Sequence, residues 1–353
     1  MTTTDLSATA ATGLSGYRRL VRRRALLAGA LATLAVVAFL ADVVTGPSDL
    51  NPLQLLSGLF APDSVSRPVH TIIWQVRLPY ALMAVMVGAA LAVSGAEMQT
   101  TLNNYLASPF TLGIASAASF GAALAIILGF GLPQIPQNWV LSGNAFIFAF
   151  ASILFLQAAS RLRGAGAETV VLLGIALSFT FNALLTLVQF VASPQALQQV
   201  IFWMMGSLTR STWDKLAVLA LVLALVLPFS FAASAKLTAL RLGEERARSF
   251  GVNVGRLRFG SLFRVSLLTA TSMAFVGTIG FIGLVSPHIA RMLVGEDHRF
   301  LLPVSALTGA ALMSGASIVS KSVLPGVLLP IGMITALIGL PVFAWLIFTR
   351  GRA

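Results

Sequence analysis

Between residues 80 and 350 the chain alternates apolar runs of about 20 residues with short connectors that carry arginine. Only 10% of its residues are charged and 57% are hydrophobic, which leaves too little charge to cover a soluble protein of this size. An α-helix needs about 20 apolar residues to cross the hydrocarbon of a bilayer, whereas the strands of a membrane barrel alternate over about 10 residues. The pattern therefore predicts an all-α polytopic membrane protein.

Eight apolar runs have the length of a single membrane span. They are residues 25–45, 80–99, 113–132, 139–160, 169–192, 214–233, 301–320 and 327–348. A ninth run, Leu262–Val294, is too long for one span and short for two. The first run is not predicted to be a cleaved signal, because it has the length of a full span and no small-residue cleavage site follows it. Residues 1–16, which are rich in Thr, Ala and Ser, are expected to be disordered.

The basic residues predict the orientation of these spans. Five arginines stand at positions 18, 19, 22, 23 and 24, just before the first run. Cytoplasmic connectors are enriched in Lys and Arg, so the N-terminus is expected in the cytoplasm. Counting crossings from there leaves only five of the 23 basic residues outside: Arg67, Arg77, Arg210, Lys215 and Lys321.

This asymmetry also predicts how the ninth run is threaded. Arginines flank both of its ends, so both ends should be cytoplasmic and the run should cross twice, with a turn near 277–280. The returning piece, 280–294, is short and contains Pro287, and such helices need shielding by protein and tend to line a pathway. The prediction is about ten spans in one transmembrane domain, 25–350, with a cytoplasmic tail at 1–24, a cytoplasmic loop at 234–260 and both termini in the cytoplasm.

The composition and motifs argue against several function classes. The net charge of +12 is explained by orientation in the membrane, so nucleic-acid binding is not predicted. No cysteine is present for a disulfide or a zinc–thiolate site, and His70, His288 and His298 lack metal-ligand spacing. No paired carboxylates or Ser-His-Asp arrangement stand out. We therefore expect no catalytic residue and no metal site, and we do not expect an enzyme.

A nucleotide-binding motif is also lacking. The nearest approach to a phosphate-binding loop is 315–322, which has Ser320 where the second glycine is needed and lies at the end of a span. If ATP drives transport, we expect ATP and Mg²⁺ to be bound by a separate chain.

Polar residues within the spans leave alternatives open. Glu97 is the one acid that we place well inside a span, and an intramembrane carboxylate suggests function. It would be the titrating group of a proton-coupled secondary carrier, or a neutral group that reaches water or a backbone donor. Ser178, Asn182 and Gln189 form a mildly polar stripe on the run 169–192, which fits a solute path or helix–helix hydrogen bonds.

Two connectors are unusual. Residues 103–113 are too apolar for an exposed loop and too polar for a helix. They are either re-entrant or packed against the pore, or they form a tight connector satisfied by its own Asn side chains. In the loop 234–260, Gly243 and Gly251 bracket a short mixed-charge helix that is too short to be stable alone. It must rest on the membrane surface or on a partner protein, and its acidic residues favour the protein.

From about residue 67 to 350 the chain resembles the FecCD-type permeases of ABC importers for iron–siderophore, haem and vitamin B12. The stretches that carry the resemblance are 77–79, 87–99, 106–113, 202–208, 242–258, 280–291, 297–303 and 329–341, of which Gly280-Phe-Ile-Gly-Leu-Val-Ser-Pro-His-Ile-Ala-Arg291 is the most specific. The resemblance implies a type II ABC importer permease architecture with ten helices per subunit, in the inner (cytoplasmic) membrane. It also implies a second permease subunit, identical or sister, two cytoplasmic ATP-binding subunits and a periplasmic or lipoprotein binding protein. Ferric siderophore is the expected cargo, with haem and vitamin B12 as alternatives.

The resemblance assigns roles to particular residues. The ATPase would meet Leu242, Gly243, Glu244, Glu245, Arg246, Arg248 and Gly251. A gate and pathway would involve Leu106, Gly166, Ala167, Glu168, Ser178 and Asn182.

The binding protein would dock on Arg77, Tyr80 and Lys321, although Tyr80 stands where the family commonly has Arg and Lys321 lacks the bidentate fork of Arg. Arg67 would compensate for the missing charge. Further departures are Tyr105 for a common Pro, and Ala316 and Leu328 where acids are common.

Overall fold

The computed structural model describes residues 3–46, 50–131, 133–162, 167–324 and 326–350. Within these residues the chain is helical and forms no strand. Seven of the helices are long and apolar enough to span a membrane, and three shorter apolar helices at 114–127, 282–294 and 331–344 accompany them. The prediction of an all-α polytopic protein is confirmed, with seven helices of spanning length and three shorter apolar helices where about ten spans were expected.

The apolar helices are α1 (Thr3–Val44), α4 (Leu78–Thr101), α5 (Ile114–Ile127), α6 (Gln137–Leu162), α7 (Ala167–Phe190), α9 (Trp213–Ala232), α12 (Val254–Val276), α13 (Ile282–Val294), α14 (His298–Ser322) and α15 (Ile331–Arg350). The connectors add α2 (Pro52–Phe60), α3 (Arg67–Thr71), α8 (Pro194–Met204), α10 (Ser234–Arg241) and α11 (Glu244–Ser249). A 3₁₀ turn, η1 (Pro62–Ser64), and a π-helical segment, η2 (Ile72–Arg77), complete the chain.

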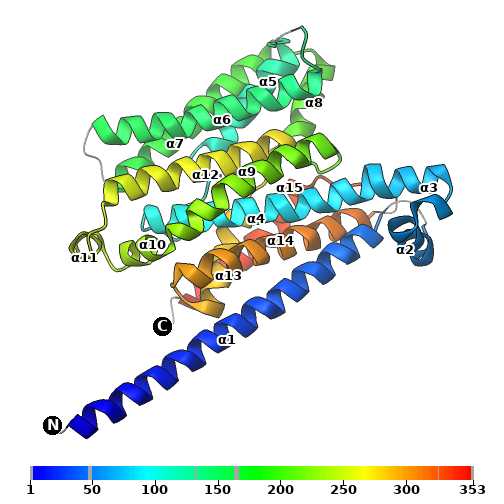
Figure 1. The fold of residues 1–353 in the computed structure, drawn as a ribbon. Coiled ribbons are helices and arrows are strands. Elements are labelled where there is room, and N and C mark those ends of the chain that lie inside the picture. The colour runs from blue at the N-terminus through cyan, green and yellow to red at the C-terminus, as the bar shows by residue number, and fades with distance from the viewer. Residues whose placement is uncertain (1–2, 47–49, 132, 163–166, 325, 351–353) are drawn as a thin grey trace.

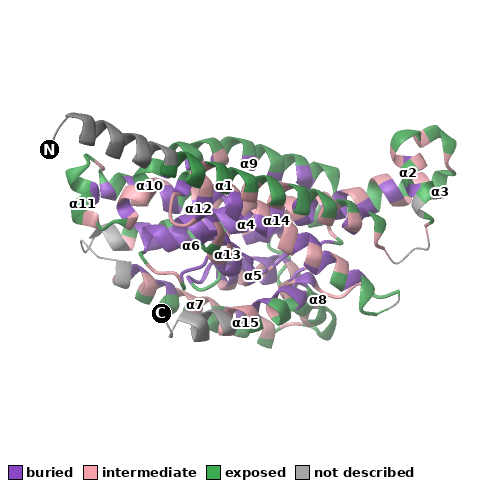
Figure 2. Cartoon of the chain, turned by 90° about the horizontal axis from the view of Figure 1, so that it is seen from below, coloured by how far each residue is buried: buried purple, intermediate pink, exposed green. Residues whose placement is uncertain are grey.

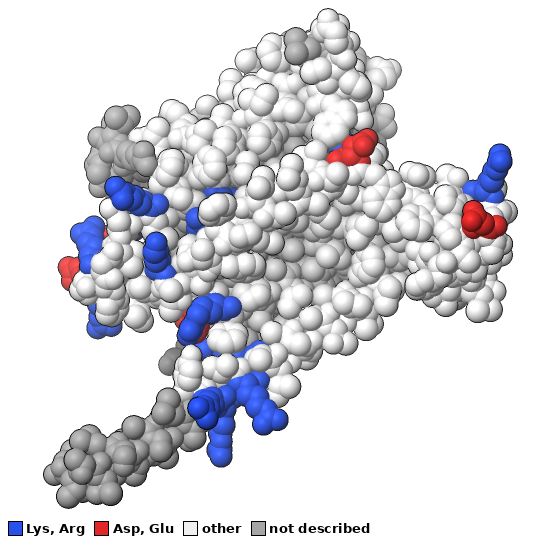
Figure 3. Space-filling model, viewed as in Figure 1, with Lys and Arg blue, Asp and Glu red and all other residues white. Residues whose placement is uncertain are grey.

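The long helices run roughly parallel, so the bundle has two ends (Figure 1). One, here named the α11 end, carries α10 and α11. The opposite one, the α2 end, carries α2 and α3. Lysine and arginine gather at the α11 end and along the neighbouring part of α1, whereas the middle of the bundle surface carries almost no charge (Figure 3). This distribution is the one expected of a protein whose middle lies in lipid.

Helix α4 forms the centre of the bundle. It packs against α14, α12 and α13, and every residue from Ala90 to Thr101 is buried (Figure 2). Helices α1, α7 and α9 lie on the outside and leave many large apolar side chains exposed. The apolar faces thus point outward as well as inward, as lipid permits.

Two glycine pairs let α4 approach its neighbours closely. A Cβ atom on Gly88 would overlap the carbonyl of Gly309 on α14, and a Cβ on Gly95 would overlap the carbonyl of Gly283 on α13. Lipid supplies no hydrophobic force between helices, so close backbone packing of small residues has to hold them together.

The ninth apolar run forms two helices, and the turn between them lies where the sequence predicts it. α12 ends at Val276, and α13 begins at Ile282 after a turn in which Gly277 (φ 81°) and Phe281 (φ 64°) have left-handed backbone. α13 is about 20 Å long, and most of it is buried against α4 and α14. Protein therefore shields the short helix, as its length and Pro287 required.

Several elements differ from the sequence-based expectation. α1 begins at Thr3, so residues 3–16 are helical and the expectation of disorder there is wrong. α2 and α8 were not predicted, because hydropathy reveals only long apolar runs. Both carry local start signals: Asn51 and Gln54 form a capping box before α2, and Ser193 caps α8.

The connector 103–113 has the local hydrogen bonds expected of the second of its alternatives. The Asn104 side chain accepts a hydrogen bond from the amide of Leu106 (2.9 Å), and Ser108 and Thr111 bond each other. Ala107, Ser108 and Pro109 are buried against the bundle. The segment is a tight connector that satisfies its own polar groups.

The glycine packing predicts opposite outcomes for two substitutions on α14. Gly309→Ala should lower the thermal stability of the detergent-solubilised protein by about 1–3 kcal/mol, because the added methyl overlaps the backbone of α4. Gly315→Ala is the matched control, since a Cβ there meets no atom within 4 Å, and it should be neutral or stabilising by up to about 1 kcal/mol. Equal melting temperatures for the two variants would contradict the close approach.

Candidate functional site

The loop 234–260 forms an open surface at the α11 end. Gly243 (φ 111°) and Gly251 (φ 78°) bracket α11 as predicted. On this segment the side chains of Leu242 and Phe250 are 54% and 66% exposed. The remaining exposed residues of the predicted ATPase-contacting set are Gly243, Glu245, Arg246, Arg248 and Gly251, whereas Glu244 is half-buried.

α11 is held against the bundle by Arg258 of α12 and by its own buried residue Ala247. Arg258 of α12 donates hydrogen bonds to the Glu244 carboxylate and to the carbonyl of Thr101 at the end of α4 (3.3 Å). Ala247 is fully buried beneath the helix. A displacement of α11 would therefore be transmitted through Arg258 to α12 and to the end of α4.

The predicted gate residues are only partly described. Leu106 lies at the α11 end with 53% of its surface exposed. Gly166 lies outside the described residues, and Ala167 and Glu168 begin α7. On α7, Ser178 donates to the carbonyl of Gly174 (2.9 Å) and lies beside Gly113 of the connector.

The face of α7 is largely uncovered in the single chain. Asn182 is exposed, together with the large apolar side chains Leu172, Phe179 and Leu187. An exposed amide in the middle of a spanning helix is poorly suited to lipid, and such residues usually face another helix or a water-filled path.

Glu97 is an ion-pair partner in the core. Its carboxylate accepts two hydrogen bonds from the Arg264 guanidinium (3.1 and 2.6 Å) and one from Ser261 (2.5 Å). This pairing joins α4 to α12. The partner that the structure shows for Glu97 is neither water nor a backbone donor, as expected above, but a cation at the edge of α12.

The three residues predicted to receive the binding protein are buried. Arg77, Tyr80 and Lys321 are 4%, 5% and 8% exposed. Arg77 donates to the carbonyls of Val43 and Val44 at the end of α1 (3.3 and 2.6 Å). These side chains therefore hold helices together at the α2 end. The prediction that they are available on the outer face to a binding protein is not met, because they are buried.

Asp42 is the partner that the sequence analysis missed. The Lys321 ammonium lies 2.7 Å from the Asp42 carboxylate and 4.3 Å from the centre of the Tyr80 ring, and Ser317 also donates to Asp42. Asp42 lies inside the first apolar run, so Glu97 is not the one intramembrane acid. The missed signal was a lone acid near the end of a span, with Lys321 at the corresponding depth of another span.

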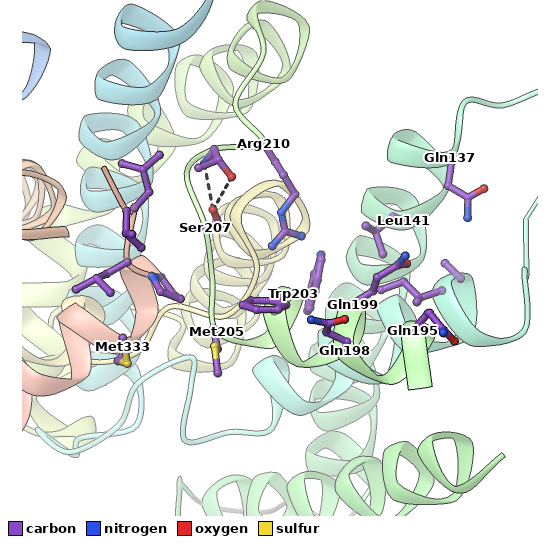
Figure 4. Close-up of a pocket in the computed structure, with 18 residues that line it drawn as sticks. Gln137, Leu141, Gln195, Gln198, Gln199, Trp203, Met205, Ser207, Arg210 and Met333 are labelled. Atoms are coloured by element: carbon purple, nitrogen blue, oxygen red, sulfur yellow. Dashed lines mark hydrogen bonds between the residues drawn. The ribbon is translucent and has the colours of Figure 1, made fainter. Parts of the chain in front are cut away.

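A cavity of about 970 Å³ opens at the α2 end, between α5, α6, α8 and the connectors that follow α8 and α14. Figure 4 shows the amides of Gln195, Gln198 and Gln199 on α8 beside Trp203, with Arg210 above them. Gln137, Ser207 and Thr209 add further polar groups to the lining. The three glutamines on α8 stand at helical spacing after the Ser193 cap, a pattern that the sequence already contained.

Arg210 is the cationic group of this cavity. Its guanidinium lies 5.9 Å from the centre of the Trp203 ring, and Lys215 donates to its carbonyl (3.0 Å). Burial lowers the pKa of Arg210 from its ordinary value. A guanidinium with little access to water gains from an anionic partner, so Arg210 can bind a negatively charged group of a solute. Most of the remaining lining of the cavity is apolar.

Comparisons with known proteins agree with this architecture. The model of the FecCD transport family matches residues 34–349. The vitamin B12 import system permease protein BtuC of Vibrio vulnificus is 35% identical, over 92% of this chain and 94% of its own. The hemin transport system permease protein HmuU of Yersinia pestis is also 35% identical, over 86% of this chain and 91% of its own.

A solved structure shares the fold as well. It is an inward-facing ABC transporter described as metal-chelate type, with a TM-score of 0.80 and 32% identity, and it covers 91% of this chain and 98% of its own. The predicted membership of the permease family is thereby confirmed. The chain belongs to the FecCD transport family of ABC transporter permeases.

Proposed function

We propose that this permease passes a ferric siderophore through the membrane as part of an ATP-driven importer. Its assignment as an ABC importer permease of the metal-chelate type comes from its family. The observation that carries the coupling part of the proposal is the exposed outer face of α11, a short helix that Arg258 and the buried Ala247 hold against the bundle. ATP and Mg²⁺ are bound by that partner, and this subunit performs no catalysis.

The orientation follows from charge. The α11 end, with its basic residues, faces the cytoplasm, and the α2 end faces outward. Both chain termini are then cytoplasmic, with a tail at 1–24 and one transmembrane domain at 25–350, in the inner (cytoplasmic) membrane. This arrangement presents the loop 234–260 to two ATP-binding subunits.

A second permease subunit, identical or sister, covers the exposed face of α7. The exposed Asn182 supports this, because a subunit interface or a hydrated path can satisfy an amide that lipid cannot. Leu106, Gly166, Ala167, Glu168 and Ser178 then stand at the cytoplasmic gate and along the path beside it.

The cavity at the α2 end receives the cargo from a binding protein. Its volume of about 970 Å³ lies at the upper end of the range for small-molecule sites. Its lining is mostly apolar, and the amides, hydroxyls and Arg210 within it can bind the oxygen-rich, often anionic groups of a ferric siderophore. Because Arg77, Tyr80 and Lys321 are buried in this conformation, the exposed Arg67 is the better candidate to meet an acidic binding protein.

The proposed cargo is tested by uptake into vesicles that contain the whole complex with its binding protein. The probes are a ferric hydroxamate, a ferric catecholate, haemin and cyanocobalamin. A ferric siderophore should be taken up and should stimulate ATP hydrolysis, and collapse of the proton gradient should leave uptake unchanged. Uptake of haemin or cyanocobalamin alone would reassign the cargo, and uptake that needs a proton gradient and no ATP would contradict the proposed function.

The docking role of α11 predicts the effect of Phe250→Asp. The side chain is 66% exposed, so the substitution should leave the fold intact, while a charge in an apolar contact should weaken binding of the ATP-binding subunit about tenfold. Leu53→Asp at the α2 end is the matched control, because Leu53 is 72% exposed on α2. Affinity is read by titrating the purified ATP-binding subunit onto each variant. Equal affinities for the two variants would place the ATPase elsewhere.

A further inference from the structure

Three connectors meet around Tyr105 at the α11 end. Tyr105 belongs to the connector between α4 and α5, and two guanidinium groups lie close to its ring. Arg241, the last residue of α10, is 4.0 Å from the ring centre, and Arg291 of α13 is 4.5 Å from it. We name this group, with Glu296, the Tyr105 cluster.

Glu296 closes the cluster from the connector between α13 and α14. The Tyr105 hydroxyl donates to one carboxylate oxygen (2.7 Å), and Arg291 Nε donates to the other (3.1 Å). Arg241 Nε lies 3.5 Å from that second oxygen. The carboxylate and the ring face together hold two like charges side by side, which would otherwise repel each other.

The cluster contacts both the loop 234–260, which contains α11, and the connector 103–113, which contains Leu106. Arg241 donates to the Asn103 side chain (2.5 Å), where Asn103 has left-handed backbone (φ 45°). Arg291 donates to Gln99 (3.0 Å), which is buried on α4. Arg241 directly precedes Leu242 and α11, and Tyr105 directly precedes Leu106.

We propose that Tyr105 is a positioning residue that transmits movement of α11 to the connector 103–113, and thereby sets the position of Leu106. This rests on the proposed function, in which α11 meets the ATP-binding subunit. The physical link is short: α11 moves Arg241, Arg241 moves the ring that it stacks on, and the ring is one residue from Leu106. Arg291 and Glu296 provide the fixed side of the contact, because α13 is buried.

The exposure of the cluster fits a contact that breaks and reforms. Glu296 has 37% of its side chain exposed, and Tyr105 is half-buried. The two arginines are more buried, with 14% of the Arg241 side chain and 6% of the Arg291 side chain exposed, so Glu296 is the solvent-facing part of the cluster and Arg291 its fixed part. The buried pair of Glu97 with Arg264, which joins α4 to α12, lies outside the Tyr105 cluster.

The first test separates coupling from stability in the vesicle-reconstituted complex, with ferric siderophore as the probe. Tyr105→Leu should leave ATP hydrolysis near the wild-type rate and lower the cargo carried per ATP about tenfold. Tyr105→Phe keeps the stacking and loses the bond to Glu296, so it should lose less. Tyr17→Phe, the same chemical change on α1, should behave as wild type. Hydrolysis and transport that fall in parallel in Tyr105→Leu would show a structural role and overturn the proposal.

The second test needs neither partner nor cargo, so it judges Tyr105 even if the proposed function fails. The chain has no cysteine, and a spin label on Phe110→Cys, 47% exposed in the wild type, reports on the connector. Glu244→Gln, which loosens α11 from Arg258, should raise the mobility of this label when Tyr105 is present. In the Tyr105→Leu background the same change should have no further effect. An equal shift in both backgrounds would overturn the proposal.

Discussion

The burial of α4 is the constraint on which the rest of the bundle depends. Lipid gives helices no hydrophobic reason to associate, so their packing relies on close backbone approach and paired polar groups. Helix α4 uses both, through Gly88 and Gly95 along its length and through Glu97 and Gln99 near its end. A buried charge without a partner is strongly unfavourable. The pair of Glu97 with Arg264 therefore fixes α12 against α4, and the contact of Gln99 with Arg291 does the same for α13.

The two ends of the bundle differ in how their charges are held. At the α2 end, Lys321 and Asp42 form a buried pair, and Arg77 binds the last carbonyls of α1, so opening this cluster would strand charges away from water. At the α11 end, the pair of Arg248 with Glu244 on α11 is open to solvent, where an ion pair is worth little and its loss costs little. Rearrangement of α11 therefore costs less than opening the cluster at the α2 end, and α11 is the element on which we propose that the ATP-binding subunit acts.

Much of the fold could be predicted from the sequence, because span length and arginine placement are direct consequences of lipid. The split of 262–294 into α12 and α13 and the short helix between Gly243 and Gly251 follow from those rules. Pairings between helices could not be predicted. The residues around Glu97 and Asp42 in the sequence do not indicate that Arg264 and Lys321, which lie far along the chain, are their partners. The residues expected to dock a binding protein were placed by resemblance alone, and the structure buries them in such pairings. The cavity lining was missed for a related reason: α8 is too short to stand out by hydropathy, although its glutamines share one face.

The central claim is that the α11 end faces the cytoplasm and its ATP-hydrolysing partners. It is tested most directly by labelling single cysteines in intact cells with a membrane-impermeant maleimide, since the chain has no cysteine of its own. Phe60→Cys on α2, where the native side chain is 85% exposed, and Arg256→Cys, exposed at the start of α12, mark the two ends. The account predicts that Phe60→Cys is labelled in intact cells and Arg256→Cys only after permeabilisation. Labelling of Arg256→Cys in intact cells would contradict it.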